Sequence, residues 1–382
     1  MLLCACNSDT KNAAAILPID TAPPASPKPE VFLYWVTVDK LNLRDQPNKS
    51  GKVLTQFAEG EFVEGTGEIS ANKEEITLRD IPYIEPYFKV ISTTPEQHTG
   101  WAFSAALSPV YAGSRSTLPD LGKLSQLSAF LKTLNVKKLE SGKKAIDFVT
   151  GNFNTSSGTT ADAAFIMLHQ FLFRMELDGD YFSLTETMNW SEKDYEDIWK
   201  GRFDMNKYPV TKSLTTNGFA LAEGEGMIFP VVDKSRLANF FTEKVTPPMK
   251  SYLLQQVEEQ KVNAFEDGGI VIGLDTIVDR AIFWEKFNNS HPYFVLSPET
   301  KGSEGWLRVA VLSGLDNTPA HDYETNKPNE SYAKIWAMVI EKYPGTKLAK
   351  AVKEITDAYA AGGGVKNPKV EDVINRYIGL EN

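Results

Sequence analysis

The sulfur chemistry open to this chain is confined to its first residues. Its two cysteines are Cys4 and Cys6. A cysteine peptidase or transpeptidase needs a thiol in the folded body, activated by a nearby histidine, and a structural zinc site uses several thiolates or imidazoles. Because no cysteine follows Cys6, cysteine-based hydrolysis, a disulfide framework and a thiolate metal site are excluded for the body of the chain.

Serine, metal and nucleotide chemistry have little support either. The sequence contains no G-x-S-x-G elbow and no H-E-x-x-H motif. Ser141 with Lys144, and Ser331 with Lys334, fit the S-x-x-K spacing but lack its companion motifs, so solvated helix starts are the better interpretation. No P-loop or dinucleotide fingerprint occurs. The sequence therefore favours a protein that is not an enzyme, and we predict no catalytic residue, no metal and no cofactor.

Carboxylates leave one catalytic class open. The two acids that hydrolyse a glycoside can come from distant segments, so their spacing in the sequence excludes nothing. Acidic glycine loops at 223–226 and 266–269 can present a carboxylate, although such loops are more often plain turns. His169 falls on a strongly apolar stretch, where a core imidazole is commoner than a ligand. His321 and Asp322 fall in a polar loop and are the histidine–acid pair best placed to be functional, although a structural role is favoured there too.

The charge balance argues against nucleic acid as a partner. The 382 residues carry a formal net charge of −10, and the pI is about 5.1. An acidic surface repels a phosphate backbone, and no long run of lysine and arginine relieves the repulsion. A chain of this length is expected to form two or three domains.

The N-terminus resembles the end of a bacterial lipoprotein signal. Residues 3–6, LCAC, match the pattern of a leucine, two small or apolar residues and the cysteine that receives lipid. The resemblance implies that residues 1–6 are a truncated signal, that Cys6 is lipidated, and that the protein is attached to a membrane of the cell envelope. Residues 7–30 are rich in proline and alanine and predict an extended linker. No apolar run approaches the roughly 20 residues that a membrane span needs.

Residues 31–112 predict a small β-domain. The stretch at 31–38, VFLYWVTV, is β-branched and aromatic, and short strands separated by turn residues follow it. The region resembles a bacterial SH3-like domain, a small β-barrel common in cell-envelope proteins. The resemblance is carried by LNLR at 41–44, Pro47, Gly51, Val53, Gly60, FKV at 88–90, GW at 100–101 and Leu107. An insertion at 70–86 predicts an unusually long hairpin that reshapes any ligand groove.

Aromatic residues concentrate in this β-domain and supply the candidate binding site. Strand alternation places Tyr87 on the face opposite Phe88 and Val90. Exposed aromatic rings on a small barrel make a groove for a peptide or glycan strand. We therefore name Tyr34, Tyr87 and Trp101 as candidate ligand-binding residues. Filling of the barrel interior by the same rings is an equally good interpretation.

Residues 118–382 predict a mainly α-helical domain. Leucines recur at helical spacing from Leu121 to Leu134, and residues 162–176 are apolar on nearly every face, which is typical of a buried central helix. The helices predicted from such patterns cover 121–134, 144–153, 162–176, 190–202, 233–244, 248–264, 274–288, 330–343, 346–360 and 369–378.

These patterns together predict a multidomain β + α protein, with an SH3-like barrel followed by a helical domain. The expected function is that of a lipid-anchored cell-envelope protein that binds peptidoglycan or an envelope protein through its barrel. The alternative is an envelope glycan hydrolase with catalytic carboxylates in the helical domain. A hydrolase needs a deep pocket with two convergent acids, whereas a binding protein needs a groove or a flat patch.

Overall fold

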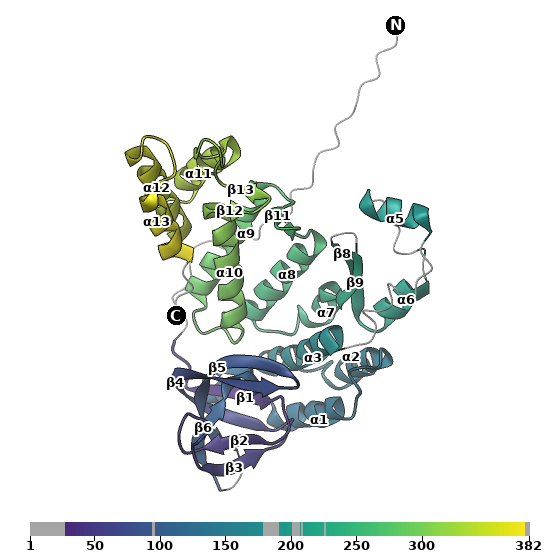
Figure 1. Ribbon diagram of the computed structural model, residues 1–382. Coiled ribbons are helices and arrows are strands. Elements are labelled where there is room, and N and C mark those ends of the chain that lie inside the picture. Colours follow the sequence, from purple (N-terminus) through teal and green to yellow (C-terminus); the bar gives the residue numbers. More distant parts are fainter. Residues whose placement is uncertain are drawn as a thin grey trace.

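The computed structural model describes residues 27–93, 96–178, 191–200, 207, 209–224 and 227–378. It shows an N-terminal antiparallel sheet region followed by a helical region, as the sequence predicts at this level (Figure 1). The sheet region lies at one end of the molecule, the helices α1, α2 and α3 lie beside it, and the helices from α8 to α13 extend away from it.

The sheet region contains seven strands in the order β3-β2-β6-β5-β4-β1-β7. All the strand pairs in it are antiparallel. The strands are β1 (Val31–Val36), β2 (Leu41–Arg44), β3 (Val53–Phe57), β4 (Phe62–Leu78), β5 (Ile81–Ser92), β6 (Thr99–Phe103) and β7 (Leu107–Gly113), with short 3-10 turns at Ser104–Ala106 and Arg115–Thr117.

The sheet is open, which corrects the expectation of a closed barrel. Its order begins at β3 and ends at β7, and these two end strands do not pair with each other. The reason is the packing of β1 and β7. Val31, Leu33 and Trp35 share a hydrophobic core with the first helices instead of closing onto β3, and the indole N–H of Trp35 donates to Ser128 Oγ at 3.0 Å. A second core, which includes Leu43 and Val90, lies within the sheet region.

The insertion forms the long hairpin that the sequence predicts. Strands β4 and β5 pair from Val63 with Ser92 outward to Leu78 with Ile81. The turn between them consists of Arg79 and Asp80, which have φ values of 50° and 66°. Two consecutive positive φ values are typical of the type I′ turn, whose twist matches that of the flanking strands.

Within the described residues, the helical region contains helices of about two to more than five turns and three small hairpins. The helices are α1 (Leu121–Lys132), α2 (Glu140–Asn152), α3 (Thr159–Asp178), α5 (Glu192–Trp199), α6 (Pro209–Thr216), α7 (Lys234–Phe241), α8 (Pro247–Lys261), α9 (Leu274–Ser290), α10 (Ser297–Leu312), α11 (Glu330–Lys342), α12 (Lys347–Ala361) and α13 (Pro368–Ile378). The hairpins pair β8 (Phe219–Gly224) with β9 (Met227–Val232), β10 (Phe265–Glu266) with β11 (Gly269–Ile270), and β12 (Gly314–Leu315) with β13 (Thr318–Pro319).

One hydrophobic core runs from strands β1 and β7 through helix α3 to the C-terminal helices. Helix α3 is buried on most faces, as its apolar sequence predicts, with Phe165, Ile166 and Leu168 each at most 2% exposed. Polar contacts reinforce the junction with the sheet, since Arg174 on α3 pairs with Glu59 at 3.1 Å. Among the described residues, no helix is long and apolar enough to cross a membrane.

Candidate functional site

The tip of the β4–β5 hairpin folds back over strand β2 and its flanking loops. The carboxylate of Glu74 accepts a hydrogen bond from the backbone N–H of Lys49 at 2.8 Å. At the turn, the guanidinium of Arg79 donates to the carbonyl of Thr37 and lies 3.6 Å from the carboxylate of Glu59. These contacts hold the hairpin over the core of the sheet region, against which Ile76 and Leu78 pack.

A groove of about 660 Å³ lies under this arch, and its lining comes from β2, the β1–β2 loop, the hairpin, β5 and β6. Tyr87 on β5 and Phe103 on β6 form its aromatic wall, with ring centroids 5.6 Å apart in an edge-on arrangement. Ile76 and Leu78 contribute apolar side chains from the hairpin. Small-molecule and peptide sites typically occupy a few hundred to about 1,000 Å³, so the groove has the size of a ligand site.

Tyr87 is the candidate residue that lines this groove. Its side chain is 1% exposed, and its hydroxyl donates to Glu74 Oε2 at 2.9 Å. Burial raises the pKa of Tyr87 above its ordinary value, and the hydrogen bond and negative charge of Glu74 raise it further, so the phenol stays protonated. Tyr87 therefore orients the same carboxylate that fixes the loop at Lys49.

Replacing Tyr87 with phenylalanine is expected to lower the free energy of unfolding by about 1 kcal/mol, because the carboxylate of Glu74 loses one of its two donors. Urea unfolding of the full chain measures the change. Tyr83→Phe is the matched control, since Tyr83 lies on the same hairpin with its side chain 36% exposed. Equal stability of the two variants would show that the Tyr87 hydroxyl does not hold the hairpin.

The other two candidate residues lie outside the groove lining. Tyr34 on β1 is partly buried and packs on Phe88 with centroids 5.4 Å apart. Burial raises the pKa of Tyr34 to about 12. Trp101 on β6 is also partly buried, and the ammonium of Lys89 lies 5.8 Å from its ring centroid. The structure thus does not bring Tyr34, Tyr87 and Trp101 together into one aromatic site.

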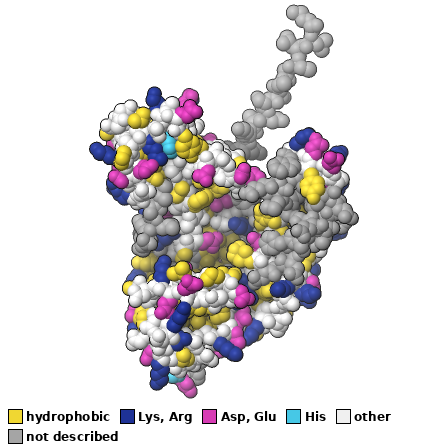
Figure 2. All heavy atoms as spheres, in the orientation of Figure 1, with side chains coloured by type: hydrophobic (Ala, Val, Ile, Leu, Met, Phe, Trp, Pro, Cys, Tyr) yellow, Lys and Arg dark blue, Asp and Glu magenta, His cyan; other side chains and the backbone are white. Residues whose placement is uncertain are grey.

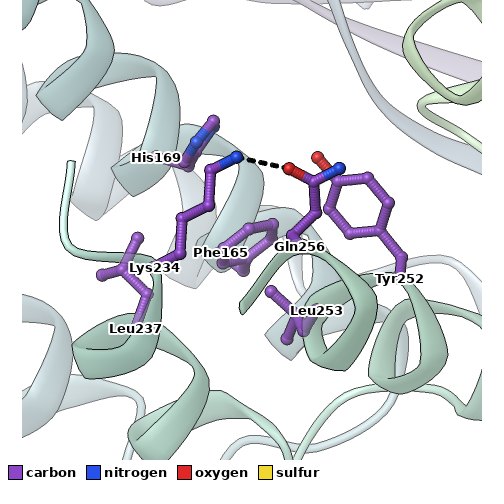
Figure 3. A pocket seen from close by; sticks show the side chains of 7 residues that line it. All are labelled: Phe165, His169, Lys234, Leu237, Tyr252, Leu253 and Gln256. Carbon is purple, nitrogen blue, oxygen red and sulfur yellow. Dashed lines mark hydrogen bonds between the residues drawn. The ribbon is translucent and has the colours of Figure 1, made fainter. Parts of the chain in front are cut away.

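A second, much smaller pocket lies in the helical region between α3, α7 and α8. The face of the molecule in Figure 2 is hollowed near its centre, at the level of α7 and α8. The pocket holds about 10 Å³, which is room for about one water molecule. Figure 3 shows its polar side chains pointing toward one another, with the ammonium of Lys234 donating to Gln256 Oε1 beside the ring of His169.

Burial dominates the electrostatics of this small pocket. Desolvation, together with the positive charge of Lys234, lowers the pKa of His169 to about 4, so the imidazole is neutral at neutral pH. Desolvation also lowers the pKa of Lys234, although the negative charges of Glu299, Glu259 and Glu176 counteract it. Burial raises the pKa of Tyr252, whose hydroxyl donates to Glu299.

The carboxylates around this pocket already accept hydrogen bonds from the protein. Glu176 accepts from the backbone N–H of Val232 at 2.7 Å, and Glu259 accepts from the indole N–H of Trp284 at 2.8 Å. A cavity for one water is too small for a sugar ring between two acids. Among the described residues, no group of three or more histidine, cysteine, aspartate and glutamate side chains converges as metal ligands.

The remaining sequence candidates are spread over the chain. His321 Nε2 lies 3.4 Å from the ammonium of Lys366, and desolvation together with that charge lowers the pKa of His321. The carboxylate of Asp322 caps its own turn by accepting from Thr325. Cys6 and part of the acidic loop at 223–226 lie outside the described residues.

Sequence reasoning missed the charged side chains of the groove. Arg44 belongs to the LNLR motif, but nothing local shows that a hairpin tip will lie over it. The length of the insertion at 70–86 was the available signal, because a long hairpin on a small sheet must either project into solvent or fold back.

Comparisons with family models, with curated proteins and with solved structures gave no match to this chain.

Proposed function

We propose that this protein is a lipid-anchored component of the bacterial cell envelope whose N-terminal sheet region, SH3-like in its strand motifs, binds a cell-wall or envelope-protein ligand without transforming it. The groove of about 660 Å³ under the β4–β5 hairpin is the observation that carries this proposal. Its size and the exposed side chains of Lys40 and Lys49 in its lining suit an extended ligand.

The membrane anchor in this proposal rests on the N-terminal sequence. Residues 3–6, LCAC, provide the lipid-accepting Cys6, and the linker at 7–30 separates it from the sheet region. A linker of this composition gives a tethered domain reach and rotational freedom. The envelope ligand of the groove would add a second point of attachment besides the lipid.

Binding is favoured over glycan hydrolysis by the state of the carboxylates. Of the two acids that line the groove, Glu59 is paired with Arg79 and Arg174, and Asp39 lies in the exposed loop before β2. The pocket beside Glu259 and Glu299 admits about one water. Neither arrangement presents two convergent acids on either side of a space for a sugar.

Co-sedimentation with purified peptidoglycan sacculi tests the binding proposal. The full chain carrying Cys6→Ser, which cannot be lipidated, is expected to sediment with the sacculi and to release no soluble fragments. The double variant Ile76→Ser/Leu78→Ser removes partly buried apolar side chains that line the groove and pack on the sheet core, and it is expected to lose retention while circular dichroism shows that it stays folded. Ile69→Ser/Ile84→Ser, which removes side chains that are 61% and 62% exposed, is the matched control.

Release of soluble fragments would overturn the proposal in favour of hydrolysis. Equal retention of both double variants would show that the groove is not the binding site. The anchor is tested separately by labelling growing bacteria with a clickable fatty acid. Cys6→Ser is expected to abolish labelling of the protein, whereas Cys4→Ser is expected to retain it, and the reverse result would contradict the assignment of Cys6.

A further inference from the structure

The groove under the hairpin is a basic site on an acidic protein. Among the side chains that line it are the cations Lys40, Arg44, Lys49 and Arg79. The acidic lining residues are Asp39 and Glu59. Four cations against two acids give the lining a formal charge of +2, while the whole chain carries −10. Arg79 pairs with Glu59. The remaining cations Lys40, Arg44 and Lys49 still outnumber the remaining acids at the groove, Asp39 and Glu74, so the field favours a ligand of negative charge.

The cations are arranged along the groove rather than in one cluster. Lys40 lies just before strand β2, and Arg44 is the last residue of that strand. At the rise of a β-strand, the four positions between them correspond to a backbone separation of about 13 Å. Lys49 follows in the next loop, and Arg79 lies across the groove at the hairpin turn. This separation exceeds the size of a single carboxylate or phosphate, so it suits a ligand with negative groups distributed along its length.

Two of these cations are available to a ligand. Lys40 and Lys49 are exposed, and neither ammonium has an ion-pair partner in the part of the chain that the structure describes. Arg44, by contrast, uses part of its guanidinium to donate to the carbonyl of Gly51 at 2.7 Å. The contact of Glu74 with Lys49 involves only the backbone N–H, which leaves the ammonium of Lys49 able to point into the groove.

The groove also offers an apolar surface between the charges. The side chains of Ile76 and Leu78, which are partly buried, lie beside the basic strand. The rings of Tyr87 and Phe103, 1% and 3% exposed, form the floor behind them. In an extended peptide, alternate side chains point to opposite sides, so acidic and apolar side chains can contact the basic and apolar walls in turn. A phosphate polymer has no side chains to bury against these apolar residues, so the lining favours a peptide.

We propose that the groove binds an acidic peptide segment in an extended conformation, with carboxylates contacting Lys40, Arg44 and Lys49 and apolar side chains packing on the partly buried Ile76 and Leu78. This inference rests on the proposed binding function of the groove and adds the chemical class of its ligand. Because the two lysines are solvent-accessible, the affinity should fall as salt screens their charge.

Fluorescence anisotropy with the full chain carrying Cys6→Ser tests this assignment. The probe is a fluorescein-labelled nonapeptide with glutamate at alternate positions and leucine and serine between them. Peptides with glutamine or lysine in place of glutamate, and inorganic polyphosphate, are the comparison ligands. The acidic peptide is expected to bind more tightly than the other peptides, and less tightly when salt rises from about 50 mM to about 300 mM.

The double charge reversal Lys40→Glu/Lys49→Glu is expected to weaken binding of the acidic peptide by about tenfold or more, because two attractions become repulsions. Lys137→Glu/Lys369→Glu changes the net charge equally at exposed lysines of the helical region and is the matched control. It is expected to leave binding of the peptide nearly unchanged. Equal loss in both double variants would show that net charge, and not the groove, controls binding, and would overturn the proposal.

The comparison ligands separate the other outcomes. Equal or tighter binding of the glutamine or lysine peptide would overturn the ligand class. Binding of polyphosphate without the acidic peptide would replace the peptide with a phosphate polymer. If sacculi retain the chain through Ile76 and Leu78 but no acidic peptide binds, the ligand class is wrong and the proposed function stands. If neither sacculi nor peptide binds, both proposals fail.

Discussion

Replacing Trp284 with alanine is expected to lower the free energy of unfolding by about 3–5 kcal/mol. Trp284 is completely buried on α9, where its ring meets Tyr252, Phe283 and Phe287 edge-on. The substitution leaves a large cavity at this aromatic cluster. It also removes the indole donor from the carboxylate of Glu259, which keeps its 2.7 Å bond from Gln255.

Trp306→Ala is the matched control for this prediction. Trp306 on α10 packs edge-on against Phe265 but is 50% exposed, so its loss is expected to cost less than about 1 kcal/mol. Urea unfolding followed by circular dichroism measures both changes. A cost for Trp284→Ala no larger than that for Trp306→Ala would contradict the placement of α9 at the centre of the helical region.

The second large effect is a dependence of stability on pH. The pKa of His169 is about 4 in the folded protein, against 6.5 for an unperturbed histidine. Above pH 6.5 both states hold a neutral imidazole. As the pH falls from 6.5 to 4, the unfolded state binds a proton that the folded state does not, so stability decreases, by about 2 kcal/mol after allowance for partial exposure.

Asp162 acts in the opposite direction. Burial raises the pKa of its carboxyl to about 6 despite two hydrogen bonds from Thr246. Between pH 6 and the ordinary value of 3.8, the folded state therefore binds the additional proton, and this group increases stability as the pH falls. The contribution of His169 must accordingly be measured as a difference between two proteins.

Urea unfolding of the parent and of His169→Gln at several pH values isolates that difference. The stability of the variant relative to the parent is expected to increase by about 2 kcal/mol between pH 6.5 and 4. His98→Gln, in the turn beside Glu96, is the control for loss of a histidine. A relative stability of His169→Gln that does not change with pH would show that His169 titrates normally in the folded protein.

Patterns within a single element predicted much of the fold. Alternation and β-branched residues predicted β1, the apolar sequence at 162–176 predicted the buried helix α3, and the insertion at 70–86 predicted the long hairpin. Each of these signals is local, because the prediction uses only the residues of the element itself and the side chains that these residues bury. The change from sheet to helices near residue 118 is visible for the same reason.

Features that depend on packing between distant elements were not predictable in this way. The expectation of a closed barrel was wrong because Leu33 and Trp35 pack against helices that begin about 90 residues later, with Ser128 as the partner of Trp35. Helix α10 was missed because Gly302 and Gly305 lower its helix propensity, and its packing against α9 outweighs that cost.

The candidate site was predicted in part. Tyr87 lines the groove, whereas Tyr34 packs on Phe88 and Trp101 lies near Lys89. Strand alternation gives the face of a side chain but not what covers that face. The cover over Tyr87 is the hairpin tip, and its position depends on Glu74 and Arg79, which contact residues more than 20 positions away in the sequence.

Hydrogen–deuterium exchange of the full chain tests the central claim, that the groove under the hairpin is the ligand site. The Cys6→Ser protein is compared with and without soluble peptidoglycan fragments. We predict increased protection of the backbone in the segments 37–49 and 74–87, which line or support the groove, and unchanged exchange in α8 and α9. Protection confined to α3, α7 and α8 would contradict the account and would place the ligand beside His169 and Lys234.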